Sequence, residues 1–211
     1  MPRTTHRLRV ILFLKGLLFG FLLAATVGPM WVLCFRRTLA QGALAGFVSG
    51  MGIAVADGLY GAVAAFGLTA ISGFLLRHGF WIGLAGGAFL VYLGVKILIS
   101  NPTMNGKEEQ KVSHAKAFLS TLGLTLANPP TILAFAAIFA DLGLASNADY
   151  GAASLIVLGV FLGSASWWVL LAAGAGWLRG RVGPKLFRVI NVVSGLTILG
   201  FALWQLAAVL R

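Results

Sequence analysis

The sequence is poor in charge, in acidic residues and in cysteine. Only 10% of its 211 residues are charged, and Asp and Glu together number five. Soluble domains carry about a quarter charged residues, so this balance indicates a membrane protein. The single cysteine, Cys34, cannot form an internal disulfide, and its position in an apolar run indicates a packing role. No P-loop motif occurs, so ATP-driven transport would require another subunit.

Long apolar runs make up most of the chain, and 59% of the residues are hydrophobic. Each run approaches the roughly 20 residues that cross the hydrocarbon core of a bilayer. The sequence therefore predicts an all-α integral membrane protein with six transmembrane helices, in a single transmembrane domain over residues 1–211. The runs cover residues 10–35, 43–71, 80–99, 117–140, 152–178 and 189–210.

The two halves of the chain resemble each other. Gly28-Pro29 corresponds to Asn128-Pro129 at an offset of one hundred residues. Three helices in each half is an odd number, so the second copy enters the membrane in the opposite direction. We therefore predict two inverted three-helix repeats, over 10–99 and 117–210, joined by a polar loop over 100–116.

Basic residues give the chain a net charge of +11. They occur in short clusters without interleaved aromatics, so we expect no nucleic-acid partner and assign them to orientation in the lipid bilayer. Ten Lys and Arg flank the loops after the first, third and fifth helices, against six on the other side. This count places the polar loop in the cytoplasm, although the basic N-terminus argues the other way. It includes Arg36 and Arg37, which are expected to end the first helix.

Pro29 and Pro129 interrupt two of the predicted helices. Proline lacks an N–H and clashes with the preceding turn, which kinks or breaks a helix. Paired interruptions in two halves of a transporter point to a substrate site, where freed backbone groups can meet a ligand. Gly28, Pro29, Asn128 and Pro129 are therefore candidate substrate-binding residues. The alternative is an ordinary proline kink.

Asp57 is the only acidic residue inside a predicted transmembrane run. A carboxylate costs several kcal/mol in the membrane, so an intramembrane acid is a candidate functional group. It could bind a substrate ammonium group or take up and release a proton. The alternative is a structural acid that is hydrogen-bonded to neighbouring helices.

Small residues recur at every fourth position in the first two runs, which predicts closely packed helix faces. Ser164 and Asn191 are expected to join helices through hydrogen bonds. Trp167 and Trp168 are expected at a membrane interface, although they could line a cavity. The small residues are Gly16, Gly20, Ala24 and Gly28, and then Gly42, Gly46, Gly50, Ala54 and Gly58.

Four segments together resemble the lysine exporter (LysE/RhtB-type) family of translocators. They are a Gly-Pro first helix followed by a glycine-rich helix with an internal Asp, the third-helix segment GGAFLVYLGVKIL, the Asn-Pro segment LTLANPPTILAFAAIF, and the C-terminal segment RVINVVSGLTILGFALWQL. The resemblance covers nearly the whole chain. It implies export of amino acids or related small zwitterionic metabolites across the bacterial inner membrane, coupled to protons entering the cell.

The resemblance also implies a substrate site at Gly28, Pro29, Asp57, Asn128 and Pro129. This sequence departs from the family pattern in two places. Met30-Trp31 follows Gly-Pro where many members have Asn, and Pro130 follows Asn-Pro where many have Lys. A basic amino acid is therefore not the expected substrate.

Other functions fit the sequence less well. A disulfide-relay enzyme needs paired thiols, and only Cys34 is present, so we expect no enzymatic activity and no cofactor. A metal-ion exporter would need a ligand cluster, but the three histidines are scattered and we predict no metal site. Export of another small solute, a non-transporting membrane scaffold and assembly into a homo-oligomer remain open alternatives.

Overall fold

The described part of the chain consists of helices and short connections between them. This computed structural model describes residues 2–66, 69–99, 112–128, 131, 135 and 150–210, without the side chains of 2–6 and 69–76. No strand occurs within these residues. The helices are α1 (Pro2–Ala25), α2 (Pro29–Gln41), α3 (Ala43–Ala65), α4 (Thr69–Ile99), α5 (His114–Leu126), α7 (Tyr150–Arg179) and α8 (Pro184–Val209).

Five of these helices are long and apolar enough to cross a membrane. They lie at Arg7–Ala25, Ala43–Ala65, Arg77–Ile99, Tyr150–Arg179 and Pro184–Val209. The prediction of an all-α, multi-pass membrane protein is therefore confirmed. Among the described residues, α2 and α5 have 13 residues each, about 20 Å of helix, which is too short to span the bilayer alone.

The first predicted run is two helices rather than one. Helix α1 ends at Ala25, and α2 begins at Pro29, a residue whose missing N–H suits the first position of a helix. The prediction that Arg36 and Arg37 end this run is wrong, because α2 continues to Gln41 and both side chains are buried, with exposed fractions of 8% and 5%. Their guanidinium groups lie between helices, where hydrogen bonds to neighbouring side chains stabilise them.

Other predicted boundaries also move. Helix α3 ends at Ala65, and α4 already begins at Thr69, so Arg77 and His78 lie within α4 instead of separating two spans. Arg77 is exposed there, and a long arginine side chain can extend its charge toward water, so Arg77 need not end the helix. The polar loop 100–116 lies outside the described residues up to 111.

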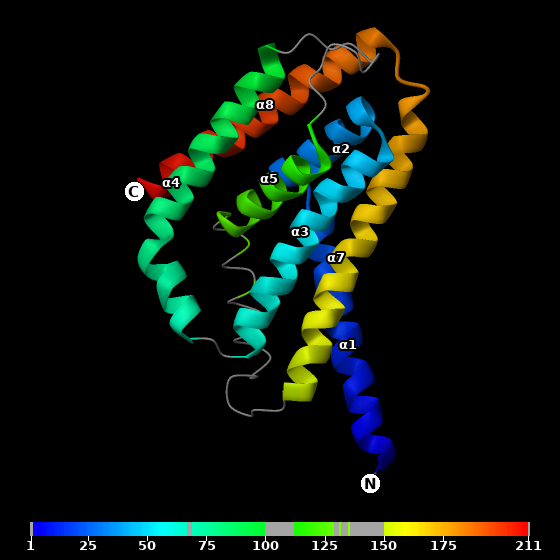
Figure 1. The fold of residues 1–211 in the computed structure, drawn as a ribbon, viewed down its shortest axis with the longest axis vertical. Helices are drawn as coiled ribbons and strands as arrows, with labels where there is room; N and C mark the ends of the chain where they lie inside the picture. Colours follow the sequence, from blue (N-terminus) through cyan, green and yellow to red (C-terminus); the bar gives the residue numbers. More distant parts are fainter. Residues whose placement is uncertain are drawn as a thin grey trace.

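The described helices form two groups with α2 and α5 between them (Figure 1). Helix α4 packs along α8 on one side, and α7 packs against both α1 and α3 on the other. The C-terminal ends of α2 and α7 and the N-terminal ends of α3, α5 and α8 meet at one end of the bundle. We call it the basic end, because it contains Arg36, Arg37, Lys116, Arg179, Arg181, Lys185 and Arg188.

Helices α1 and α7 touch through their backbones. Gly16 and Gly20 of α1 face the carbonyl oxygens of Ile156 and Val160, so close that a Cβ atom at either glycine would overlap with them. Gly163 of α7 faces the carbonyl oxygen of Leu17 in the same way. Close backbone contact gains dispersion energy, which matters in a bilayer where burial from water cannot drive association. The small-residue pattern of the first run therefore marks this contact.

A single residue connects α2 to α3. Gly42 has φ of +100°, a conformation that side chains with a Cβ rarely adopt, and its N–H donates to the Thr38 carbonyl oxygen at 2.9 Å. Arg179 of α7 donates to the Ala40 carbonyl oxygen at 3.2 Å, which satisfies one of the last carbonyl groups of α2. The turn is therefore fixed on both of its sides.

Two amide side chains of α8 hold α4 in register. Asn191 Nδ2 donates to the Ile97 carbonyl oxygen at 2.7 Å, and Gln205 Nε2 donates to the Gly83 carbonyl oxygen at 2.8 Å. Both amides are buried. Each bond supplies a buried amide with an acceptor inside the bundle, so the prediction that Asn191 joins helices is confirmed.

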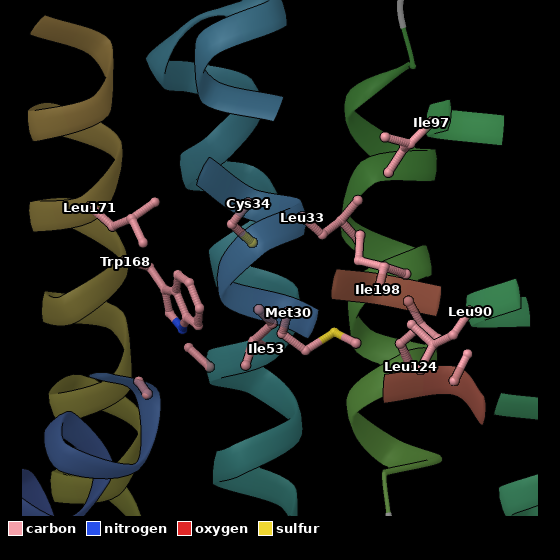
Figure 2. Close-up of a cluster of buried hydrophobic side chains, with 13 residues drawn as sticks. Met30, Leu33, Cys34, Ile53, Leu90, Ile97, Leu124, Trp168, Leu171 and Ile198 are labelled. Atoms are coloured by element: carbon pink, nitrogen blue, oxygen red, sulfur yellow. The ribbon is translucent and has the colours of Figure 1, made fainter. Parts of the chain in front are cut away.

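An apolar cluster fills the centre of the bundle (Figure 2). Trp168 points from α7 toward α2 and α3, near Cys34 and Ile53. Leu33 of α2 and Leu124 of α5 belong to the same cluster. Cys34 is a free, completely buried thiol, which agrees with its predicted packing role.

Candidate functional site

Helix α2 begins inside the bundle, at the break that separates it from α1. Gly28 is extended, as residues before proline tend to be, and no side chain caps α2. The first intrahelical bond runs from the Val32 N–H to the Gly28 carbonyl oxygen, so the N–H groups of Met30 and Trp31 precede the hydrogen-bonded turns. These groups and the positive end of the helix dipole favour an anion.

A second break follows α5, which ends at Leu126 just before Asn128. Its last carbonyl groups are satisfied by other helices. Tyr60 of α3 donates to the Leu126 carbonyl oxygen at 2.6 Å, and Gln205 Nε2 lies 3.5 Å from the Ala127 carbonyl oxygen. Interrupted helices are tolerated in membranes only where such partners exist.

Asn128 makes two hydrogen bonds with Thr131. Its Nδ2 donates to Thr131 Oγ1 at 3.0 Å, and the Thr131 N–H donates to the Asn128 carbonyl oxygen at 3.1 Å. The amide oxygen of Asn128 has no protein donor in the described part of the chain. It is therefore available to a ligand.

Asp57 is a buried carboxylate, 2% exposed, in the middle part of α3. Ser164 of α7 donates to Asp57 Oδ2 at 2.7 Å, and Trp168 Nε1 donates to Ser164 Oγ at 3.2 Å. No cation pairs with Asp57 among the described residues. A buried carboxylate supported by one neutral donor leaves most of its acceptor capacity free for a cationic ligand.

One cavity of about 180 Å³ joins these features. It is smaller than the roughly 300–1,000 Å³ pockets that hold drug-sized ligands, which suits a small metabolite. Its polar side chains are Thr26, Asp57, Thr125, Asn128 and Thr131, and its other lining residues are Leu23, Ala24, Val27, Gly28, Met30, Trp31, Ile53, Trp168 and Phe201.

Two buried polar groups belong to residues that line this cavity and have no partner. Thr125 Oγ1 and Trp31 Nε1 make no hydrogen bond to any residue that the structure describes. Buried polar atoms are nearly always hydrogen-bonded, so an unpaired donor or acceptor at a cavity needs an explanation. A bound ligand would supply the missing partners.

The structure thus brings together three of the five predicted site residues. Gly28, Asp57 and Asn128 line the same cavity. Pro29 adjoins it as the first residue of α2 but is not part of the lining, and Pro129 lies outside the described residues. The functional role of all five stays a prediction.

The five predicted site residues did not include two others that belong to this site. Trp168 is 2% exposed and lines the cavity, so the interfacial position expected for it is wrong and the alternative, a cavity position, is confirmed. Ser164 was assigned to helix joining and does join two helices, but its acceptor is Asp57 itself. The four-residue spacing of Ser164 and Trp168 on one helix was the available signal.

Comparisons with known proteins agree with the resemblance. The family model described as LysE type translocator matches residues 21–208. The putative amino acid efflux protein YcgF of Bacillus subtilis (strain 168) is 28% identical over 92% of this chain and 94% of its own length. The leucine efflux protein of Salmonella typhimurium is 26% identical over 90% and 91%, respectively.

A third relative carries a different kind of name. The chemotactic transduction protein ChpE of Pseudomonas aeruginosa is 27% identical over 90% of this chain and 95% of its own length. No solved structure matches the chain. The family match covers nearly all of the chain, including both helix breaks, Asp57 and the cavity they form. This multi-pass membrane protein therefore belongs to the LysE type translocator family.

Proposed function

We propose that this protein is a secondary transporter that exports amino acids or related small zwitterions across the bacterial inner membrane. The observation that carries the proposal is the cavity in which Asp57 lies without a cationic partner among the described residues, beside the uncapped N-terminus of α2. A transporter of this kind needs no enzymatic chemistry.

The two polar features suit the two charges of a zwitterion. Asp57 would bind the ammonium group, and the N–H groups of Met30 and Trp31 would bind the carboxylate. The Asn128 amide and Thr125 Oγ1 would complete the hydrogen bonds. Substrate recognition at interrupted helices in mid-membrane is the pattern of several transporter classes.

The apolar part of the cavity favours a neutral, aliphatic side chain. Ile53, Met30, Trp168 and Phe201 offer no charged group to a substrate side chain. Relatives named as amino acid and leucine efflux proteins support the same expectation. Pro130 stands where many family members have lysine, which distinguishes this protein from them.

The helix contacts support two inverted repeats over 10–99 and 117–210. Under this arrangement α3 corresponds to α7, α4 to α8, and α1 with α2 to α5 and the residues after it. Helices α3 and α7 pack together, as do α4 and α8, and the contact of α1 with α7 has its counterpart in α5 with α3. A two-fold axis through the bundle would produce this set of contacts.

Proton coupling would follow from competition at Asp57. A carboxylate that binds either a proton or a substrate ammonium group, but not both, exchanges one for the other in each transport cycle. Protons would then enter as the substrate leaves, with the basic end in the cytoplasm.

The burial of Arg36 and Arg37 changes the count of basic residues on which this orientation rests. Without these two residues, eight Lys and Arg flank the helices on the side of the basic end, against six on the other side.

Intracellular metabolite levels test the proposed function. Cells that overproduce the protein are loaded with leucine-containing dipeptides, and internal and external amino acids are followed over time. We expect internal leucine or another neutral aliphatic amino acid to fall several-fold faster than in cells without the protein, and a protonophore to abolish the difference. Unchanged levels of every amino acid would contradict the proposal.

A further inference from the structure

Between the cavity and the basic end, α2, α3 and α5 each present an apolar residue and then a polar or charged one. At the cavity lie Pro29 of α2, Asp57 of α3 and Asn128 after α5. Four residues from each, toward the basic end, lie Leu33, Ile53 and Leu124, and four residues farther lie Arg37, Ser49 and Ser120. Within a helix, a spacing of four keeps residues on one face, about 6 Å apart along the axis, and this holds for all of these residues except Asn128, which lies just beyond the end of α5.

The middle layer is an apolar closure. Leu33, Ile53 and Leu124 are 2–4% exposed and belong to one hydrophobic cluster. Figure 2 shows Leu33 pointing from α2 toward α5 and Ile53 lying beneath the first turns of α2. Passage of a polar solute between these three side chains is unfavourable in the conformation described here, because it would remove hydrogen bonds of the solute without replacing them.

The outer layer is a set of hydrogen bonds made by Arg37. Its Nη1 donates to Ser49 Oγ at 3.1 Å and to the Ala117 carbonyl oxygen at 3.0 Å, and its Nη2 donates to Ser120 Oγ at 2.9 Å. One guanidinium group thus ties α2 to α3 and α5. These are the same three helices whose apolar residues close the layer beneath.

The charge of Arg37 is not compensated by these bonds. All its acceptors are neutral, and no carboxylate contacts it in the described part of the chain. Arginine has five N–H donors, so Nε–H and one Nη2–H remain without an acceptor there. A carboxylate can take two such neighbouring donors at once and supplies the missing negative charge.

We propose that Arg37 is the gating residue at the basic end of the translocation path and that it recognises the carboxylate of the arriving substrate. The carboxylate binds the two N–H donors that have no acceptor, and its charge draws the guanidinium group away from the two serine hydroxyls. This releases α2 from α3 and α5, so the apolar layer can open toward Asp57. The proposal deepens the amino acid export proposed above and rests on it for the identity of the carboxylate.

The test of the gate uses labelling, which requires no transport. Thr125, in the cavity, is replaced by cysteine in a Cys34→Ser background. A water-soluble maleimide is then added to sealed vesicles in which the basic end faces the outside solution, and labelling of Lys185→Cys identifies this orientation. We expect Arg37→Gln to accelerate labelling about tenfold and Ser120→Ala about threefold. Arg179→Gln, which removes an arginine at the same end with one bond to α2, is the matched control and should leave labelling unchanged.

Transport kinetics test recognition of the carboxylate. For L-leucine, Arg37→Gln should raise KM about tenfold, whereas for leucinamide, which lacks the carboxylate, KM should stay within about twofold of the wild-type value. Arg37→Lys, which keeps the charge, should restore part of the leucine KM. Equal KM changes for both compounds would overturn the carboxylate role, and labelling at the wild-type rate in Arg37→Gln and Ser120→Ala would overturn the gate. A wild-type protein that moves no amino acid would contradict the proposed function, while the labelling result would still decide the gate.

Discussion

Asp57→Asn is expected to reduce amino acid efflux by at least about 30-fold. Asparagine has nearly the same shape and can still accept the hydrogen bond from Ser164, so the fold should be retained. It loses the negative charge that would hold a substrate ammonium group or a proton. Removing one partner of a buried charged pair costs about 2–5 kcal/mol, and each 1.4 kcal/mol is a factor of ten. Initial rates of efflux from loaded vesicles measure the loss.

Ser164→Ala is the matched control for Asp57. It removes one hydrogen bond from the carboxylate but keeps the charge, so efflux should fall only a few-fold. Efflux at the wild-type rate in Asp57→Asn would remove this residue from the mechanism. It would leave the helix breaks and the family membership as they are.

Gly163→Ala is expected to destabilise the protein severely. A Cβ atom at this position would overlap with the Leu17 carbonyl oxygen and approach the Phe21 N atom to 2.8 Å, and a backbone cannot move aside as a flexible side chain can. Overpacking of this kind costs about 1–3 kcal/mol or more. We expect a lower midpoint of thermal unfolding in detergent and a smaller monodisperse fraction on size exclusion.

Gly174→Ala supplies the control from the same helix. Among the described residues, no atom outside the neighbouring backbone of α7 lies within 4 Å of a Cβ built at Gly174. Replacing a helical glycine with alanine in open space favours the helix by up to about 1 kcal/mol, so this variant should be as stable as the wild type or more stable. Equal destabilisation by the two substitutions would show that the contact between α1 and α7 is not what limits stability.

The sequence was sufficient for the features that depend on local chemistry. Apolar runs predict membrane helices, Pro29 predicts an interruption of the first run, and Asp57 stands out because acids are rare in membranes. The three residues Gly28, Asp57 and Asn128 were predicted to share one site, and the structure places them at one cavity.

Features that depend on which helices face each other could not be predicted. Arg36 and Arg37 resemble the basic residues that flank a transmembrane helix, and only the neighbouring α3, α5 and α8 show that they are buried. Two successive four-residue spacings lead from Asp57 to Ser49, from Asn128 to Ser120 and from Pro29 to Arg37, and all of them are present in the sequence. They acquire meaning only when α2, α3 and α5 are known to share a face.

The hydrogen bonds between α4 and α8 limit how the bundle can move. Asn191 and Gln205 are separated by as many residues on α8 as Ile97 and Gly83 are on α4, so both bonds fit one antiparallel register. If one helix slid past the other by a turn, two amide groups and two carbonyl groups would lose their hydrogen-bond partners at once, and the hydrocarbon core supplies no others. We therefore expect α4 and α8 to move together as one rigid body, so that a rearrangement that admits a substrate takes place around this pair and not within it.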